Sequence, residues 1–304
     1  MRTSLTIHET HHNTKRTKVF VRFRVFRVFV CFAAALLCGV VSPLVAQRGR
    51  GAAPAAPTSP RAAAPIDLTG YWVSIVTEDW RYRMVTPPKG DFASVPLNDE
   101  GRKVVQAWDP AADEASGNAC KSYGAANIMR VPGRLHITWR DDSTLEIDTD
   151  AGTQKRLFHF GESQPPSGDA DWQGYSVAQW EFAGAPQRGG GGGAVGAIIA
   201  PGATAAGRRD SAPAAPPRPQ GGSLKVVTTR LKAGYLRKNG VPYSENTIVT
   251  EYFDRHNEPN GDQWFTVTTI VEDPKYLQQP FITSTHFKKE ADGAKWRPTA
   301  CSAS

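Results

Sequence analysis

The stretch that decides the fold is Arg134-Leu-His-Ile-Thr-Trp-Arg140, which the polar turn Asp141-Asp-Ser143 joins to Thr144-Leu-Glu-Ile-Asp-Thr149. Apolar and polar residues alternate strictly in the first and third of these segments. Such alternation is typical of a β-strand with one buried face. A connection this short joins antiparallel neighbours, so the sequence predicts a β-hairpin here.

Similar strand signals continue on both sides of this hairpin. The segments with strand character are residues 71–76, 134–140, 144–149, 154–160, 173–182, 224–231, 246–254, 264–271 and 281–288. So many strands with mostly short connections must protect their edges from further pairing, and a closed barrel does so. We expect an all-β fold with minor α content, an antiparallel β-barrel of about 8–10 strands; a two-sheet sandwich is the alternative.

One short helix is expected after Pro96. Asn98 is a suitable N-cap, and Asp99 and Glu100 place negative charge in the first turn, where the helix dipole favours it. Asp109-Pro110 is expected to end the helix, because proline disfavours a helical residue before it. The chain from there to about residue 130 is expected to be irregular.

The charge of the chain is concentrated at its start. The formal net charge is +7, and residues 1–46 hold seven of the 36 basic residues but only one of the 29 acidic ones. The remainder is nearly balanced, which argues against a nucleic-acid partner, because phosphate binding needs a basic surface.

Residues 1–46 have the pattern of a signal peptide: a basic region, an apolar run at 28–41, and small or apolar residues before Gln47. An uncleaved membrane anchor is the alternative, but the run is short for a span of about 20 residues. We therefore expect a periplasmic or secreted protein with no stable membrane span after cleavage.

Two further segments have low sequence complexity. Residues 47–66 are rich in Ala, Pro and Arg and predict a disordered tether, and residues 186–222 are rich in Gly and Pro. Both flanks of the second segment have strand character, so we interpret it as a disordered insertion at a hairpin tip, where added length costs little. The expected organisation is one barrel domain over residues 67–304, interrupted by this insertion.

Cysteine usage agrees with export. Cys31 and Cys38 lie in the leader, which leaves Cys120 and Cys301. Two cysteines in an oxidising compartment most simply pair, so we expect a Cys120–Cys301 disulfide. No further ligands stand at metal-binding spacing around them, and we expect no metal and no cofactor.

The start of the first strand resembles a known motif. Gly70-Tyr-Trp72 is similar to the Gly-x-Trp opening of lipocalin-type (calycin-like) barrels, in which the Trp closes the barrel base beneath an Arg from the end of the chain. The resemblance implies such a barrel, with Arg297 as the partner of Trp72.

A broader resemblance covers most of residues 67–290. The chain resembles a family of exported bacterial proteins of uncharacterised function. The resemblance rests on Trp108-Asp-Pro-Ala-Ala-Asp113, on Trp172-Gln-Gly-Tyr-Ser-Val-Ala-Gln-Trp-Glu181, and on Val249-Thr-Glu-Tyr-Phe253 with the residues around them. In that family the strand ending near Glu181 leads directly into the next strand, which favours the insertion. The resemblance implies export and fold but brings no activity.

The candidate ligand-binding residues are aromatic or imidazole side chains on predicted strands. They are Trp72, His136, Trp139, His159, Tyr175 and Trp180. Aromatic residues line ligand pockets, although ordinary core packing is the alternative interpretation. If one end of the barrel is open, the histidines and Tyr175 would supply the polar contacts of an apolar pocket.

No catalytic constellation is evident, and we identify no catalytic residue. The carboxylates of Glu272 and Asp273 point to opposite faces of a strand, and Ser176 lacks the glycine elbow of a nucleophile because Ala178 stands in its place. The leading hypothesis is an exported binding protein for a small apolar or amphipathic molecule. The alternatives are a hydrolase or isomerase with His and acid residues inside the barrel, and an envelope interaction protein. The oligomeric state is left open.

Overall fold

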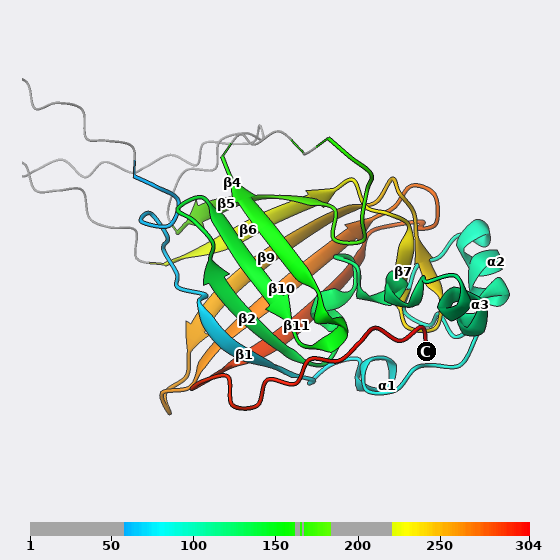
Figure 1. Ribbon diagram of the computed structural model, residues 1–304, viewed down its shortest axis with the longest axis horizontal. Coiled ribbons are helices and arrows are strands. Elements are labelled where there is room, and N and C mark those ends of the chain that lie inside the picture. Colours follow the sequence, from blue (N-terminus) through cyan, green and yellow to red (C-terminus); the bar gives the residue numbers. More distant parts are fainter. Residues whose placement is uncertain (1–57, 162–164, 166, 184–220) are drawn as a thin grey trace, which may run out of the picture. The chain divides into compact units, whose positions relative to one another are not determined.

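The computed structural model describes residues 58–161, 165, 167–183 and 221–304, and within them nine strands close into a barrel (Figure 1). Around the ring they follow the order β1-β11-β10-β9-β6-β5-β4-β3-β2. Their bounds are β1 Gly70–Ile75, β2 Arg134–Trp139, β3 Thr144–Thr149, β4 Lys155–Phe160, β5 Tyr175–Phe182, β6 Gly222–Thr229, β9 Ile248–Asn257, β10 Gln263–Glu272 and β11 Phe281–Glu290. The predicted all-β barrel is confirmed.

One neighbouring pair of the barrel is parallel, whereas the sequence predicted antiparallel neighbours throughout. β4 and β5 run in the same direction, with Phe158 opposite Ser176. A ring with an odd number of strands cannot alternate in direction all the way round, so one parallel pair is unavoidable. The chain therefore enters β4 and β5 from the same end of the barrel.

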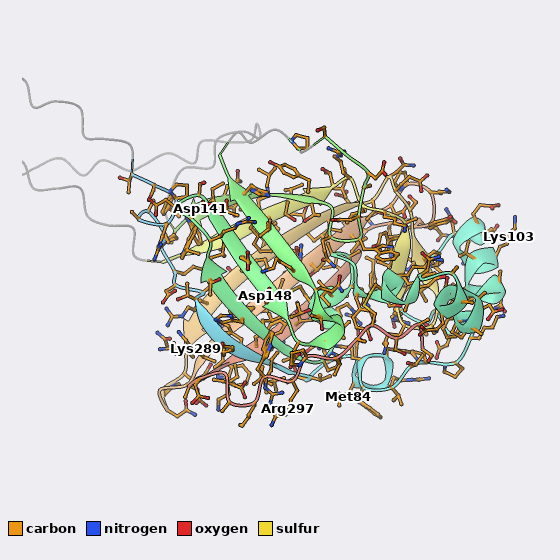
Figure 2. The ribbon with its side chains drawn as sticks, in the orientation of Figure 1. Met84, Lys103, Asp141, Asp148, Lys289 and Arg297 are labelled. Carbon is orange, nitrogen blue, oxygen red and sulfur yellow. A yellow bond between two sulfur atoms is a disulfide. The ribbon has the colours of Figure 1, made fainter. Side chains whose placement is uncertain are left out.

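The two ends of the barrel differ. We call the end with residues 140–143 and 258–262 the turn end; Asp141 marks it in Figure 2. At the opposite end, the helix end, lie the short helices and the hairpin of β7 (Gly234–Arg237) and β8 (Val241–Tyr243) (Figure 1). Of the described helices, none has the length and hydrophobicity to cross a lipid bilayer.

The bounds of the described helices are α1 Trp80–Arg83, α2 Asp99–Ala107, α3 Pro110–Ala115, and the 3-10 helices η1 Ala119–Tyr123, η2 Ile128–Arg130 and η3 Ala151–Thr153. Two of these described helices, α2 and α3, begin at side-chain caps, whereas α1 and the 3-10 helices have none. The Asn98 side chain accepts a hydrogen bond from the Gly101 amide at 3.0 Å, so the predicted cap of α2 is confirmed. Asp109-Pro110, expected only as a stop, also begins α3: Asp109 caps it and Pro110 occupies its first turn.

The strands on either side of the Gly/Pro-rich segment are paired with each other. β5 and β6 are antiparallel neighbours, with Phe182 opposite Gly222. Residues 186–220 of the predicted insertion lie outside the described residues. The predicted signal peptide and residues 47–57 of the predicted tether lie outside them as well. Residues 58–66 differ from the expected tether: the Pro60 carbonyl accepts a hydrogen bond from Trp180 Nε1 at 2.8 Å, and Ile66 packs against the core.

The interior of the barrel is filled by side chains. One hydrophobic cluster takes buried residues from all nine strands, among them Trp72, Phe158, Phe253, Phe265 and Phe287. Several of these rings are in edge-on or stacked contact, for example Trp72 with Phe265 at 4.7 Å between ring centroids. Aromatic packing of this kind stabilises the interior beyond simple burial.

A buried ion pair crosses this interior. Arg156 on β4 and Glu251 on β9 are fully buried, and they form two hydrogen bonds, at 3.0 and 2.6 Å. Arg156 also donates to Thr228 Oγ1 at 3.3 Å, and Ser176 Oγ lies 2.8 Å from the same hydroxyl. Four strands therefore meet at one polar group.

We expect the single change Glu251→Leu to lower the free energy of unfolding by about 3–5 kcal/mol, because it leaves the Arg156 guanidinium buried without a counter-charge. The double change Arg156→Met/Glu251→Leu is expected to lie much closer to wild type, since it removes both charges. Urea unfolding curves measure both effects. Equal losses in the single and double variants would contradict this interpretation.

The predicted disulfide is present. Cys120 in η1 is bonded to Cys301, 181 positions away in the sequence, and the two Cα atoms are 5.1 Å apart. Close by, the Thr299 amide donates to the Asp150 carbonyl at 2.8 Å. The C-terminal segment is thereby fixed along the barrel to the helix end, as Figure 1 shows in red.

Replacing both cysteines, Cys120→Ser/Cys301→Ser, is expected to lower stability by at most about 4–5 kcal/mol, because a cross-link over so long a loop removes much entropy from the unfolded chain. The urea midpoint of the variant measures the loss. Wild-type protein unfolded with a reductant is the matched control, and it should reproduce the midpoint of the variant. A wild-type midpoint that is insensitive to the reductant would count against a stabilising cross-link.

Candidate functional site

The six sequence-predicted ligand residues do not gather in one pocket. Trp72 is fully buried in the filled interior, and its Nε1 donates to the Leu68 carbonyl at 2.8 Å. It is therefore a core residue at the turn end. The other five divide into an outward-facing group and an aromatic group at the turn end.

His136, His159 and Tyr175 face away from the barrel interior, which corrects the expectation that they would line it. His136 stacks on Tyr71, with 4.1 Å between ring centroids, and His159 stacks on Tyr175 at 5.1 Å. Partial burial lowers the pKa of His159 from its usual value, with the positive charge of Arg140 adding to the effect and Asp141 opposing it. Alternation explains the placement, because the neighbours of each histidine take the inner face.

The same alternation applies to the remaining histidines on described strands. His256 and His286 lie on β9 and β11 between inward-facing neighbours, so they also face outward. A hydrolytic or isomerising site built from histidines inside the barrel is therefore not formed by the described residues.

Trp139 and Trp180 do come together, at the turn end. Their ring centroids are 6.4 Å apart, and Phe160 lies between them in the cluster, 5.4 Å from Trp139 and 5.2 Å from Trp180. Pro60 holds the Trp180 indole through the hydrogen bond described above. This part of the sequence-predicted site is present as an aromatic group at the rim of the barrel.

A cleft of about 510 Å³ opens beside this aromatic group. Its lining residues are Arg61, Ala64, Pro65, Ile66, Asp67, Thr69, Trp139 and Arg255. Of these, only Trp139 was predicted. Residues 61–66 were missed because their composition indicated a tether. Arg255 was missed although it follows Val249, Glu251 and Phe253 at the two-residue spacing of inward positions.

The cleft has one acid and two arginines. Asp67 accepts hydrogen bonds from the Thr69 amide and hydroxyl at 2.9 and 2.7 Å. Partial burial alone would raise its pKa, but these hydrogen bonds and the charges of Lys289 and Arg255 hold the pKa of Asp67 below its usual value. The Nε of Arg255 is buried with no acceptor. The cleft therefore has unused capacity for a negative group.

The cation above Trp72 is a lysine and not the arginine that the lipocalin resemblance implied. Lys289, on β11, places its Nζ 5.3 Å from the Trp72 ring centroid. Arg297 is exposed and donates to the Trp296 carbonyl at 3.1 Å, on the C-terminal segment (Figure 2). The nine-stranded ring with its parallel pair also differs from the eight-stranded up-and-down barrel of lipocalins.

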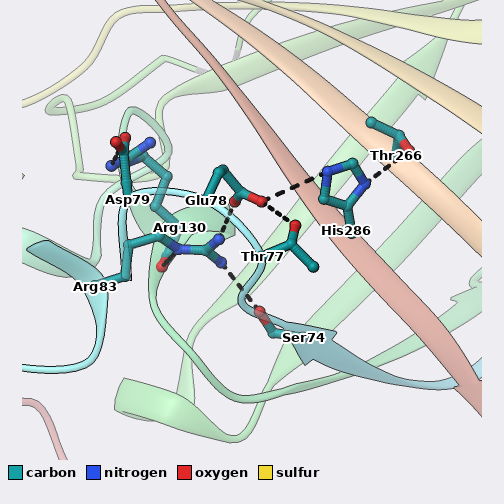
Figure 3. Close-up of polar contacts among 8 residues, drawn as sticks. All are labelled: Ser74, Thr77, Glu78, Asp79, Arg83, Arg130, Thr266 and His286. Carbon is teal, nitrogen blue, oxygen red and sulfur yellow. Dashed lines mark hydrogen bonds and ion pairs between the residues drawn. The ribbon is translucent and has the colours of Figure 1, made fainter. Parts of the chain in front are cut away.

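A second polar site lies on the outer wall, where the chain leaves β1 (Figure 3). Glu78 is the centre of the network: it pairs with Arg83, accepts from the Thr77 hydroxyl at 2.6 Å, and lies 3.5 Å from His286 Nε2. The other ring nitrogen of His286 is 3.1 Å from Thr266 Oγ1. Because both imidazole nitrogens have protein partners, we assign His286 to holding residues 77–78 against the wall.

The neighbouring outer cleft, of about 570 Å³, is lined by Thr77, His256, Glu258, Pro259, Asn260, Asp262, Trp264 and His286. Part of its charge is already paired, since Lys288 donates to Asp262 at 2.7 Å. Within the described residues no three His, Cys, Asp or Glu side chains are grouped so that they could hold a metal ion.

Comparisons of the chain with protein-family models, with curated proteins and with solved structures gave no match. The assignment of function therefore depends on the site itself.

Asp67→Asn tests the electrostatics of the turn-end cleft. A carboxyl whose folded pKa lies below its unfolded value, near 3.8, stabilises the fold above that pH, and the contribution is lost as pH falls through the folded pKa. We expect the free energy of unfolding of wild type to exceed that of the variant by less than about 1 kcal/mol at pH 6, because the carboxyl group is partly solvated. The difference should shrink below pH 4 in urea unfolding. Asp142→Asn, at an exposed carboxylate of the same end, is the control; a difference that grows on acidification would contradict the assignment.

Proposed function

We propose that this protein is an exported, non-catalytic binding protein for a small amphipathic molecule that carries a negative group, held in the turn-end cleft. The observation that carries the proposal is that Trp139 and Arg255, whose Nε lacks a hydrogen-bond acceptor, line the same cleft at the rim of a filled barrel. An apolar surface and an unused cation in one cleft suit a ligand with both characters.

The apolar side of the cleft supports this ligand class. Trp139 belongs to the cluster with Phe160 and Trp180, so its ring is held in place by other aromatic rings. Pro65 and Ile66 add aliphatic surface from the segment that crosses the turn end. A volume of about 510 Å³ is within the range of small-molecule sites, about 300–1,000 Å³, and barrel mouths are among their preferred places.

The charged side supports a negative group. Arg61 and Arg255 line the cleft with one carboxylate, that of Asp67, and the charges of Lys289 and Arg255 act on this carboxylate. Guanidinium groups bind carboxylate, sulfonate or phosphate oxygens through directed hydrogen bonds, which are stronger than neutral ones. The cleft lining therefore has more cations than anions, which favours a negative group on the ligand.

The packed interior supports a site at the rim and not inside the barrel. Buried residues from every strand form one cluster, and the ion pair of Arg156 and Glu251 occupies the polar part of the interior. The sequence-based hypothesis was a small apolar or amphipathic ligand in a pocket of the barrel; we now propose the amphipathic ligand and place its site at the end of the barrel. Export is supported by the basic and apolar leader sequence and by the disulfide, which persists in oxidising compartments.

Two fluorescent probes with the same aromatic core test this proposal. 8-Anilinonaphthalene-1-sulfonate carries a negative group, and N-phenyl-1-naphthylamine lacks it. We expect wild type to bind the sulfonate more tightly. Arg255→Met should weaken binding of the sulfonate about tenfold, because a hydrogen bond to a charged group contributes about 1.5–3 kcal/mol. The affinity of this variant for the neutral probe should be unchanged. Trp139→Ala should weaken both probes.

Arg102→Met, on α2 at the opposite end of the barrel, is the matched control and should titrate as wild type. Circular dichroism and unfolding curves confirm that each variant is folded. If folded Arg255→Met and Trp139→Ala proteins bind both probes with wild-type affinity, the turn-end cleft is not the binding site and the proposal is wrong.

A further inference from the structure

Three buried arginines meet at the helix end, away from the turn-end cleft. Arg83 on α1, Arg130 on η2 and Arg237 on β7 are 6, 3 and 2% exposed. Figure 3 shows the first two with their carboxylate partners. Buried charges are normally paired and hydrogen-bonded, so the partners of these three groups can be followed donor by donor.

Arg83 is fully satisfied. Its Nε donates to the Arg130 carbonyl at 2.9 Å, one terminal nitrogen pairs with Glu78, and the other donates to Ser74 Oγ at 3.1 Å. All three kinds of donor nitrogen are therefore used within the protein, and this arginine needs no further ligand.

Arg130 and Arg237 are not satisfied. One terminal nitrogen of Arg130 donates to Asp79 at 3.0 Å, but the other is buried without an acceptor. In Arg237, all three guanidinium nitrogens are buried without an acceptor. The guanidinium of Arg237 lies over the Tyr82 ring at 4.1 Å, a contact that holds its plane in place and leaves its donors unused.

The electrostatic surroundings show the same deficit. Burial, with the like charge of Arg130 adding to the effect, lowers the pKa of Arg237 to about 10, while Asp79, Tyr82 and Asp91 oppose the shift. Asp79 is hydrogen-bonded to Arg130, and Asp91 is paired with the exposed Arg81 at 3.5 Å. The two nearest acids are thus engaged by other arginines.

A small cavity is lined by the residues that carry these unused donors. Arg130, Arg237 and Tyr82 line it together with Lys238, and its volume is about 20 Å³. About 10–15 Å³ is enough for one water-sized particle. A water molecule could accept hydrogen bonds here, but it would leave the two like charges unneutralised.

We infer that this cavity is a binding site for a small monovalent anion, a halide or a carboxylate the size of formate, held between Arg130 and Arg237. Such an anion accepts from both guanidinium groups and offsets their repulsion. It also ties together three segments that are distant in the sequence, namely α1 through Tyr82, η2 through Arg130, and the β7–β8 hairpin through Arg237. The inference is independent of the proposed ligand at the turn end.

Thermal unfolding in different sodium salts at equal ionic strength tests the inference. Chloride, bromide and formate are compared with gluconate, which is too large for the cavity. We expect a saturable rise in the Tm of wild type with at least one small anion, because a ligand of the folded state stabilises it by mass action. Gluconate should give no saturable rise.

Arg237→Met is the decisive variant, and Arg102→Met is its matched control, because Arg102 is an exposed arginine on α2 at the same end that pairs with Asp99. Arg237→Met should weaken the fitted anion affinity tenfold or more, and in gluconate its Tm should equal or exceed that of wild type, because an unpaired buried charge has been removed. Arg102→Met should respond to the anions as wild type does.

Should Arg237→Met fail to fold, crystals of the wild-type protein soaked in bromide give a second measurement. An anomalous peak between the guanidinium groups of Arg130 and Arg237 supports the site. The inference is overturned if all four salts act alike on wild type, if folded Arg237→Met keeps the wild-type anion response, or if the soaked cavity shows no bromide.

Discussion

A ring of nine strands cannot alternate in direction around its whole circumference, and the chain meets this constraint between β4 and β5. β4 and β5 both run toward the turn end, so the residues that directly precede β5 lie at the helix end. Their backbone organises this end: the Ala125 amide donates to the Trp172 carbonyl at 2.8 Å, and the Lys232 amide donates to the Asp171 carbonyl at 2.7 Å. The cover of short helices and the β7–β8 hairpin is therefore built against residues 171–174 as well as against the barrel.

Closure of the ring leaves an interior that the inward side chains fill. Aromatic and aliphatic residues form the main cluster, and Arg156 and Glu251 form a buried ion pair across it, from strands separated by two others. The two sites that we propose therefore lie at the ends of the barrel, where segments from outside the ring meet its rim. The two sites also share one feature: each contains a guanidinium group with at least one buried nitrogen that has no hydrogen-bond acceptor in the protein.

Strand positions were predictable because the two-residue period is local, and the cap of α2 at Asn98 was predictable for the same reason. The pairing of Cys120 with Cys301 followed from a count, because these are the only two cysteines outside the leader. The alternation also determines which face of a strand each side chain takes, although the six candidate residues were chosen without regard to it. His136 lies between Leu135 and Ile137, so it must face away from Trp139. The inward Arg156 and Glu251 likewise stand at two-residue spacing from Phe158 and Phe253. The parallel pair, the packing of residues 58–66 and the meeting of Arg130 with Arg237 depend on contacts between distant segments, which no local pattern encodes. Composition alone misled the interpretation of residues 58–66, because alanine and proline suit a chain laid over a rim as well as a free tether.

The disulfide also determines how the molecule would carry mechanical load. A pulling force applied at residue 58 and at the C-terminus would run along the chain to Cys120 and pass through the covalent bond to Cys301. Strands β2 to β11 lie inside the covalent loop and would bear no tension. β1 and the helices α1 to α3 lie outside it, and β1 is held by its pairing with β2 and β11 and by the packing of Trp72. Under tension the barrel would therefore lose its first strand and keep the other eight. The resisting element would be the pairing of six residues that include Trp72, which anchors the strand in the packed interior.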